Sequence, residues 1–207
     1  MKKVLTLALG LAIVGGSMTS CKKGENDPFM SLKSRKARVA GEWVMSASES
    51  TRTTTQTFSG VSTTTTTTTV YDGTTETRTE TVAGQTPTVT TSSYVQEMTF
   101  EKDGTFTQTY TSGGSTWTSK GNWAFLTKSK EAELKKKEAI LLSVTSSTST
   151  PGTATSTYGA FEDGQVLMID QLKSKEMIIL DNSSWSDTDT GSSNTSTTTG
   201  TSTMTAK

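Results

Sequence analysis

The chain of 207 residues contains no histidine, one cysteine and three prolines. Without histidine, the commonest general base, the Ser–His and Cys–His nucleophile pairs and the usual protein ligand of zinc, copper and non-haem iron are all excluded. The phosphate-binding patterns G-x-x-x-x-G-K and G-x-G-x-x-G are also absent. We therefore expect a protein that is not an enzyme, with no catalytic residues, no metal site and no cofactor.

An excess of charge is also missing, because 20 Lys and Arg residues balance 20 Asp and Glu residues. Nucleic-acid binding relies on clustered basic residues that neutralise phosphates. The composition therefore predicts no nucleic-acid partner.

Apolar side chains are scarce, since hydrophobic residues of all kinds make up 30% of the chain and aromatic residues 7%. Threonine, in contrast, makes up about a fifth of the chain. It is β-branched, favours strands and is poor in helices. The length fits one domain, and the net charge is too low for disorder that arises from charge repulsion. Together these features predict an all-β domain with a thin core.

Residues 1–20 have the features of a secretory signal. Lys2 and Lys3 precede an apolar run, Val4 to Gly16, that is shorter than the ~20 residues of a transmembrane helix. The letters SMTSC, which end at Cys21, resemble the lipobox read by the lipoprotein signal peptidase. The resemblance implies cleavage before Cys21, acylation of that residue with chains such as palmitate, and anchoring in the outer membrane, on its periplasmic face or at the cell surface.

Residues 21–38 are expected to form a tether with a short basic segment. Ser31 is a candidate cap for a helical turn through Arg38. The basic side chains of this segment are Lys33, Arg35, Lys36 and Arg38. They fit two roles: a solvated spacer, which we favour, and a contact with anionic lipid headgroups.

Residues 39–207 show the pattern of strands. Seven consecutive threonines, Thr63 to Thr69, lie between Ser59–Gly60 and Asp72–Gly73, and Asp-Gly is a strong hairpin-turn dipeptide. In residues 75–82 threonines alternate with charged residues and a valine, as on a strand of a water-facing sheet. We therefore interpret the threonine run as a strand rather than as a disordered stalk.

The clearest pattern is an antiparallel meander over residues 94–125, with turns at Asp103–Gly104 and Gly113–Gly114. Its apolar residues alternate with threonine and are expected to face inward. They are Met98, Phe100, Phe106, Tyr110, Trp117, Trp123 and Phe125.

The remaining residues extend the strand pattern. Residues 127–139 contain i,i+4 Glu–Lys pairs and fit a short surface helix or a solvated connection. Turns at Pro151–Gly152 and Asp163–Gly164 separate later strands, and residues 182–207 fit a last strand or a disordered tail. A total of about eight to ten strands is that of a closed antiparallel up-and-down β-barrel with one short surface helix.

Gly41-Glu42-Trp43 resembles the G-x-W motif of lipocalins, in which the Trp plugs the closed end of the barrel. The segments MTFEKDGTFTQTY, GNWAF and EMIIL are similar to elements of the lipocalin-like domain of Gram-negative envelope lipoproteins. Lipocalins usually stack a late Arg on this Trp, but no Arg follows Arg78, so we expect Trp43 to have another partner, such as Arg38. The T-D-Y element of lipocalins is also absent, and the resemblance therefore implies a barrel without implying a particular ligand.

The candidate functional side chains are mainly aromatic. Those expected in the core, or around an internal cavity for an apolar ligand, are Trp43, Phe100, Phe106, Tyr110, Trp123 and Phe161. Glu97, Glu101 and Asp163 are candidates for a glycosidase pair, and WSDTDTG at residues 185–191 for a calcium loop, although both sets are more simply solvent-facing acids.

The sequence thus predicts a lipid-anchored, non-catalytic, lipocalin-like barrel. It would bind a small apolar ligand or serve a structural role. The alternative is a cell-surface module that contacts a protein or a glycan through its threonine-rich faces, and a glycosidase-type enzyme is the third hypothesis.

Overall fold

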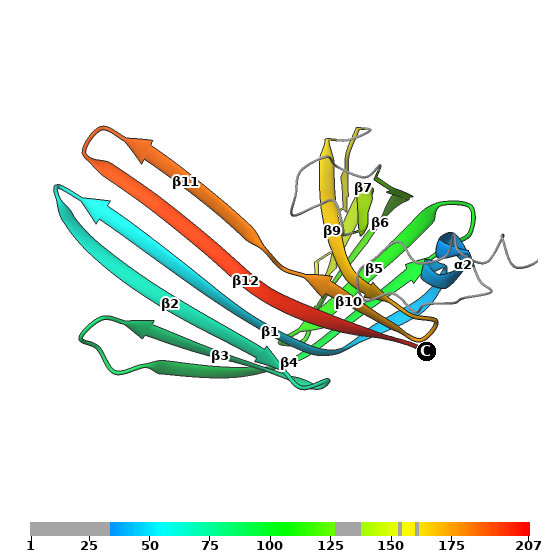
Figure 1. Cartoon of the computed structure of the whole chain (residues 1–207), viewed down its shortest axis with the longest axis horizontal. Coiled ribbons are helices and arrows are strands. Elements are labelled where there is room, and N and C mark those ends of the chain that lie inside the picture. The colour runs from blue at the N-terminus through cyan, green and yellow to red at the C-terminus, as the bar shows by residue number, and fades with distance from the viewer. Residues whose placement is uncertain (1–33, 127–137, 153–154, 160–161) are drawn as a thin grey trace, which may run out of the picture.

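A computed structural model describes residues 34–126, 138–152, 155–159 and 162–207 (Figure 1). Within these residues the chain forms one helix and twelve strands. Their bounds are α2 (Arg35–Val39), β1 (Gly41–Phe58), β2 (Val61–Tyr71), β3 (Thr75–Val82), β4 (Thr88–Phe100), β5 (Thr105–Ser112), β6 (Ser115–Phe125), β7 (Glu138–Thr150), β8 (Thr155–Thr157), β9 (Asp163–Leu172), β10 (Glu176–Leu180), β11 (Ser183–Asp189) and β12 (Ser192–Ala206).

The strands form one antiparallel sheet that closes into an up-and-down barrel of ten strands. Neighbours in the ring follow the order β1-β2-β3-β4-β5-β6-β7-β9-β10-β12, and β12 pairs with β1 to complete it. β8 and β11 lie outside this ring, on β7 and β12. The prediction of an all-β up-and-down barrel with one short helix is confirmed.

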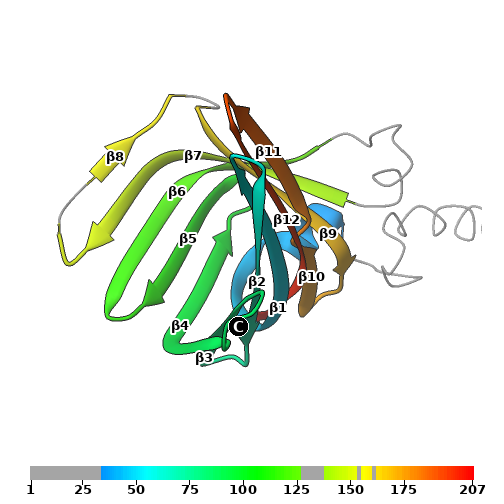
Figure 2. The same cartoon turned by 90° about the vertical axis from the view of Figure 1, so that its left-hand side faces the viewer.

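The ring is narrower at the end that carries α2. There β1 also pairs directly with β4, from Gly41 opposite Phe100 to Val44 opposite Glu97, and this pairing bypasses β2 and β3. Three long hairpins, β1–β2, β3–β4 and β11–β12, extend away from this end (Figures 1 and 2). We call their extended parts, residues 50–70, 75–93 and 183–199, the arm, and the rest of the described sheet with α2 the barrel body.

The hydrophobic core lies in the barrel body and at its border with the arm. Its buried side chains are Val39, Trp43, Met45, Tyr71, Met98, Phe100, Phe106, Trp123, Ile140, Leu142, Val144, Leu167, Ile169, Leu172, Met177 and Met204. Residues 46–70, 72–97 and 178–203, all of which the structure describes, contribute no buried hydrophobic side chain. Backbone ladders and polar side chains must therefore hold the arm together.

The threonine run is the strand β2, which confirms the prediction. Thr63 to Thr69 pair with β1 on one side, and Thr65 to Thr69 pair with β3 on the other. Hydroxyl groups meet across the strands, for example Thr55 Oγ1 and Thr64 Oγ1 at 3.1 Å. Many such Ser and Thr hydroxyl contacts take the place of apolar packing here.

Two Asp-Gly turns form as predicted. In the β2–β3 turn, Asp72 Oδ1 accepts hydrogen bonds from the backbone N–H groups of Thr74 and Thr75. The bond from Thr75, followed by those from Thr74, lowers the pKa of the Asp72 carboxyl group. Hydrogen bonds from Thr105 lower the pKa of Asp103 in the β4–β5 turn in the same way.

The expected turn at Asp163–Gly164 is wrong. Both residues belong to β9 and pair with Val144 and Ser143 of β7. The dipeptide signals a turn only where Gly adopts a positive φ, as Gly73 and Gly104 do and Gly164 does not.

The one described helix, α2, begins after Ser34, whose hydroxyl accepts a hydrogen bond from the Ala37 N–H group. The cap is thus Ser34 and not Ser31, which lies outside the described residues. The expected surface helix over 127–139 also falls outside them up to residue 137, and Glu138 and Ala139 already belong to β7. No helix among the described residues is long and apolar enough to cross a membrane.

Candidate functional site

The predicted aromatic residues separate into a closed end and an open mouth of the barrel body. Trp43, Phe100, Phe106 and Trp123 are at most 5% exposed and belong to the core. Tyr110 is half-buried and stacks on Trp117, with ring centroids 4.9 Å apart. Phe161, like Cys21, lies outside the described residues.

Trp43 and Trp123 fix the closed end through their indole N–H groups. Trp43 Nε1 donates to the carbonyl of Val39 at 2.8 Å, and Trp123 Nε1 donates to that of Glu101 at 3.0 Å. Phe100 meets Trp123 edge to face, at 5.5 Å between centroids. These groups are satisfied inside the core and contribute to its packing.

Helix α2 is part of the closed end. Arg38 is only 3% exposed and donates from Nη1 to the carbonyl of Leu172 at 2.5 Å. Arg35 forms an ion pair with the buried Glu138 and lies 4.3 Å over the ring of Phe125. The favoured interpretation of this basic segment as a solvated spacer is therefore wrong for Arg35 and Arg38.

A hollow of about 230 Å³ opens at the mouth of the barrel body, where the core meets the arm. Its apolar wall comes from β1, β4, β9, β10 and β12, and its polar rim carries two amides, a hydroxyl and a carboxylate. The lining residues are Met45, Gln96, Met98, Gln165, Val166, Leu167, Ile179, Leu180, Asp181, Ser202 and Met204. Apolar residues outnumber polar ones in this lining, as in many small-molecule pockets, but Met98 and Met204 are themselves almost fully buried, so much of the accessible surface is polar.

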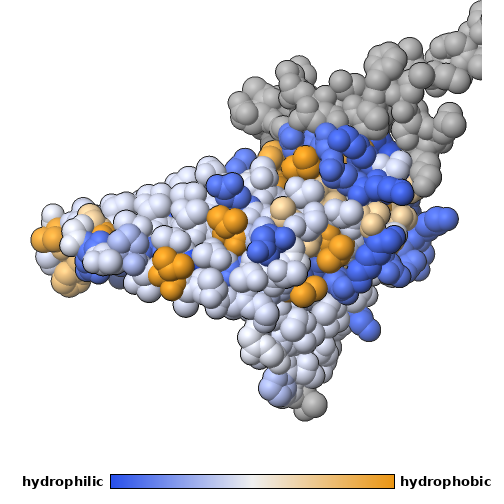
Figure 3. Space-filling view, turned by 90° about the horizontal axis from the view of Figure 1, so that it is seen from below, coloured by the Kyte–Doolittle hydropathy of each residue, from blue (hydrophilic) through white to orange (hydrophobic). Residues whose placement is uncertain are grey.

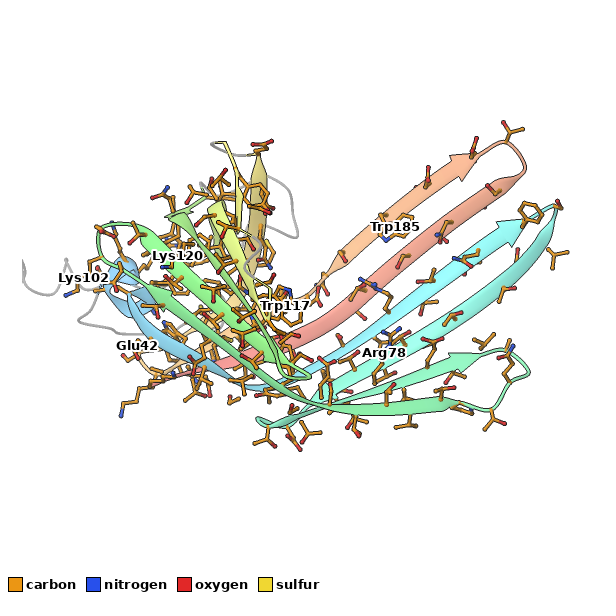
Figure 4. All side chains as sticks on the ribbon, turned by 180° about the vertical axis from the view of Figure 1, so that it is seen from behind. Glu42, Arg78, Lys102, Trp117, Lys120 and Trp185 are labelled. Carbon is orange, nitrogen blue, oxygen red and sulfur yellow. The ribbon has the colours of Figure 1, made fainter. Side chains whose placement is uncertain are left out.

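Aromatic side chains on the inner face border this mouth. Tyr71 and Tyr94 meet edge to face at 5.4 Å, and the Tyr94 hydroxyl donates to Gln96 Oε1 at 2.9 Å. Burial, helped by the negative charge of Glu76, raises the pKa of Tyr94 to about 12. Burial also raises the pKa of Tyr71, so both phenols are neutral at physiological pH. The Tyr71 hydroxyl group is itself buried. Figure 4 shows Trp117 near the same border.

A second hollow, of about 220 Å³, continues along the inner face of the arm and shares Asp181 with the first. Its lining is hydroxylic and charged: Ser50, Arg52, Thr67, Thr69, Glu76, Arg78, Asp181 and Thr198. Figure 4 shows Arg78 on this part of the arm. The mouth of the barrel therefore leads from apolar to charged surroundings.

The residues of the calcium hypothesis lie on β11. Asp187 and Asp189 face the same side and line a hollow at the tip of the arm, opposite Asn194 and Ser192. Within the described ranges, no three His, Cys, Asp or Glu side chains come together in a way that could hold a metal ion.

The glycosidase candidates do not share a site. Glu97 is opposite Val44 on the outer face of the barrel and bonds to Lys207 Nζ at 2.5 Å. Asp163 is opposite Val144, on the inner side of β9, and Glu101 lies in the β4–β5 turn. Glu97 and Asp163 are therefore on opposite faces of the barrel wall.

Three methionines line the mouth, and two of them, Met45 and Met204, were not predicted from the sequence. Met45, Met98 and Met204 are at most 7% exposed, and Met45 pairs directly with Met204. Methionine is flexible and adapts its shape, and it is common on surfaces that accept varied apolar ligands. Met98 was expected on the inner face, but the pairing of Met45 with Met204 joins the two ends of the strand series, which local patterns do not reveal.

The chain matches no family model, and no curated protein is significantly similar to it in sequence.

Proposed function

We propose that this protein is a non-catalytic, lipocalin-like binding module that takes a small apolar ligand into the mouth of its barrel. The observation that supports this function best is the hollow floored by Met45, Met98 and Met204. The opposite end is filled by Trp43 and by α2, so a ligand would enter from the side of the arm.

We further propose that the protein is held in the outer membrane, on its periplasmic face or at the cell surface, by acylation of Cys21. The lipobox-like letters before Cys21 support this anchor. Labelling with an alkyne fatty acid should mark the full chain and leave the Cys21→Ser variant unmarked. Equal labelling of both proteins would refute the anchor.

Native mass spectrometry tests the ligand. The chain from residue 21, with Cys21→Ser, would be incubated with an envelope lipid extract after circular dichroism has shown β structure. Every described element lies after residue 33, so this protein contains the whole fold. We expect a discrete, reproducible added mass, and its absence from folded protein would contradict the function.

Two neighbouring positions of β12 provide a matched pair for the same measurement. Ser202 lines the hollow, whereas Thr201 is exposed on the outer face. Ser202→Phe should fill the hollow and abolish the adduct, and Thr201→Phe should leave it unchanged. An adduct that persists in Ser202→Phe would place the ligand elsewhere.

The second candidate function is surface recognition of a protein or a glycan. It is favoured by the outer face of the arm, where uncharged hydroxyl residues form rows across adjacent strands. One row is Ser184, Thr197, Thr53, Thr66 and Thr81. The surface of the arm is accordingly pale in Figure 3, whereas strongly hydrophilic residues gather at the barrel end.

Envelope glycans immobilised on an array test this alternative. Binding that is lost in Thr66→Lys, while Ser202→Phe binds normally, would support the outer face as the recognition surface. Absence of binding by the unsubstituted protein would remove glycan recognition from the candidates.

A further inference from the structure

Three rows of inner-face residues cross the arm where it leaves the barrel body. Each row has one residue from β12, β1, β2 and β3, in that order. The row nearest the barrel body is Ser202, Ser48, Tyr71 and Glu76. The next is Gly200, Ser50, Thr69 and Arg78, and the outermost is Thr198, Arg52, Thr67 and Glu80. Charge therefore changes along the path out of the barrel. The apolar floor comes first, followed by Glu76, then by Arg78 with Asp181 beside Gly200, and then by Arg52 in the same row as Glu80.

The acidic neck is formed by Glu76 and Asp181. Neither carboxylate has an ion-pair partner among the described residues. Asp181 lines both hollows, so it stands where the apolar lining ends. Glu76 pairs with Tyr71 in the sheet and lines the second hollow. After burial, its negative charge is the next cause of the raised pKa of Tyr94.

The basic group beyond the neck is Arg52. Its Nε donates to Thr198 Oγ1 at 3.2 Å, and no carboxylate of the described residues pairs with it. Arg78, by contrast, already contacts Glu80 at 3.0 Å. The hollow that contains Arg52 also holds hydroxyl groups of Ser50, Thr67 and Thr198, which can donate to an anion, together with Glu76, Arg78 and Asp181.

We propose that the two hollows together bind an amphiphile with a zwitterionic head. This inference rests on the function proposed above, because the alkyl part would occupy the apolar floor. The cationic group of the ligand lies next to its alkyl chain and faces Glu76 and Asp181. The anionic group lies further out and bonds to Arg52 and the hydroxyl groups around it.

The dimensions agree with an elongated ligand. Thr198 is six residues beyond Met204 on β12, and a strand of that length spans about 20 Å. Neither hollow alone reaches the ~300–1,000 Å³ typical of ligand pockets, whereas the two together do.

The order of charges distinguishes this ligand class from two simpler ones. A fatty acid would place its carboxylate against Glu76 and Asp181 if its chain filled the floor, and like charges repel. A zwitterion with the phosphate next to the chain and the ammonium outside would meet the wrong partner at both positions. Only a cation-first zwitterion matches both the neck and Arg52.

Isothermal titration with decyl probes, each below its critical micelle concentration, tests the proposal on the chain from residue 21 with Cys21→Ser. The probes are N-decyl-N,N-dimethylglycine, with the cation next to the chain, decylphosphocholine, with the reverse order, decyltrimethylammonium and decanoate. We expect the dimethylglycine probe to bind about tenfold more tightly than the other zwitterion and than decanoate.

Single substitutions test which residue binds the anionic group of the ligand and which binds the cationic group. The dimethylglycine probe should also bind more tightly than decyltrimethylammonium, which has no anionic group. Arg52→Gln should remove this advantage, and Lys102→Gln, on an exposed turn, should keep it. Asp181→Asn should weaken both cationic probes by about tenfold, whereas Asp163→Asn should not. Arg52 and Asp181 are both exposed, so these variants should fold normally.

The outcomes separate the two proposals. Equal affinities for all probes, or a preference that Arg52→Gln leaves unchanged, would overturn the zwitterion site while keeping the apolar pocket. Tighter binding of decanoate or of decylphosphocholine would overturn the proposed order of charges. If none of the four decyl probes binds folded protein, both the zwitterion site and the apolar-ligand function are wrong.

Discussion

The barrel body and the arm are made by the same continuous sheet, but different side chains hold them. In the barrel body the inward positions of β1 and β12 are Trp43, Met45 and Met204, all buried. A few residues further along the same two strands, the inward positions are Arg52, Thr54, Ser196 and Thr198. Strand pairing therefore continues where apolar packing stops, and the proposed ligand site lies at this change.

In this sheet, backbone pairing between strands does not require a hydrophobic core beneath them. Burial of apolar surface contributes roughly 25 cal/mol for each Å², so a large buried side chain contributes more free energy than one hydrogen bond, which contributes about 1 kcal/mol net. We therefore expect substitutions in the barrel body to cost far more free energy of unfolding than matched substitutions in the arm.

Substitution of the two tryptophans should show the largest difference in the free energy of unfolding. Trp43 is 1% exposed in the barrel body, and Trp185 is 49% exposed on the arm. Trp43→Ala should lower the free energy of unfolding by about 3–5 kcal/mol, and Trp185→Ala by less than about 1 kcal/mol. Urea denaturation measures both, and similar losses would mean that the arm has a core of its own.

The two ion pairs should come next. Glu138, whose side chain is 1% exposed, pairs with Arg35 in the barrel body, whereas Glu80 pairs with Arg78 on the open surface of the arm. Glu138→Gln should cost about 3 kcal/mol, because it leaves a largely buried Arg35 without its counter-charge, and Glu80→Gln less than about 1 kcal/mol. Unfolding of both variants at the same urea concentration as the parent protein would contradict the larger cost expected for Glu138→Gln.

A smaller effect is expected from the hydroxyl ladder. Thr54 Oγ1 and Ser196 Oγ are 3.2 Å apart on the inner face, and Ser196 is buried. Thr54→Val should cost about 1 kcal/mol, since it leaves the Ser196 hydroxyl without this partner. Thr53→Val, on the exposed outer face, is the control and should be near neutral. Stabilisation by Thr54→Val would show that the arm gains nothing from this pair.

The smallest effect concerns pH at the β2–β3 turn. The pKa of Asp72 is lower in the folded protein than in the unfolded chain, so its ionised form stabilises the fold above the unfolded pKa of about 3.9. That contribution is lost as pH falls through the folded pKa. Asp72→Asn should therefore reduce the stability difference between pH 5 and pH 2, as thermal melts would record. An unchanged difference would show that Asp72 does not contribute to the acid dependence.

Much of the fold could be predicted because its signals are local. The alternation around Phe106 and Tyr110 placed the meander, and Asp72–Gly73 ended the threonine strand at its turn. Residues 182–207, left open between a strand and a disordered tail, form β11 and β12 because this stretch completes the ring against β1. That contact joins the first and last strands of the described sheet and has no local signature.

The candidate site was less predictable, because contacts between strands that are distant in the sequence form it. The aromatic residues identified from sequence are mostly the closed end, and the mouth is made by methionines from three separate strands. Arg52 and Asp181 are unremarkable in the sequence, and only the register of β1, β2 and β12, with β10 leading to Asp181, brings them to one hollow.

We propose that the ligand site lies between a stable barrel body and a less stable arm. Local opening is favoured where few apolar side chains are buried. Amide hydrogen exchange of the ligand-free protein measures this directly. We expect slow exchange, limited by global unfolding, in β5, β6 and β9, and faster exchange by local opening in β2, β3 and β11. Equal protection throughout the sheet would show a single cooperative unit and would contradict the division at the mouth.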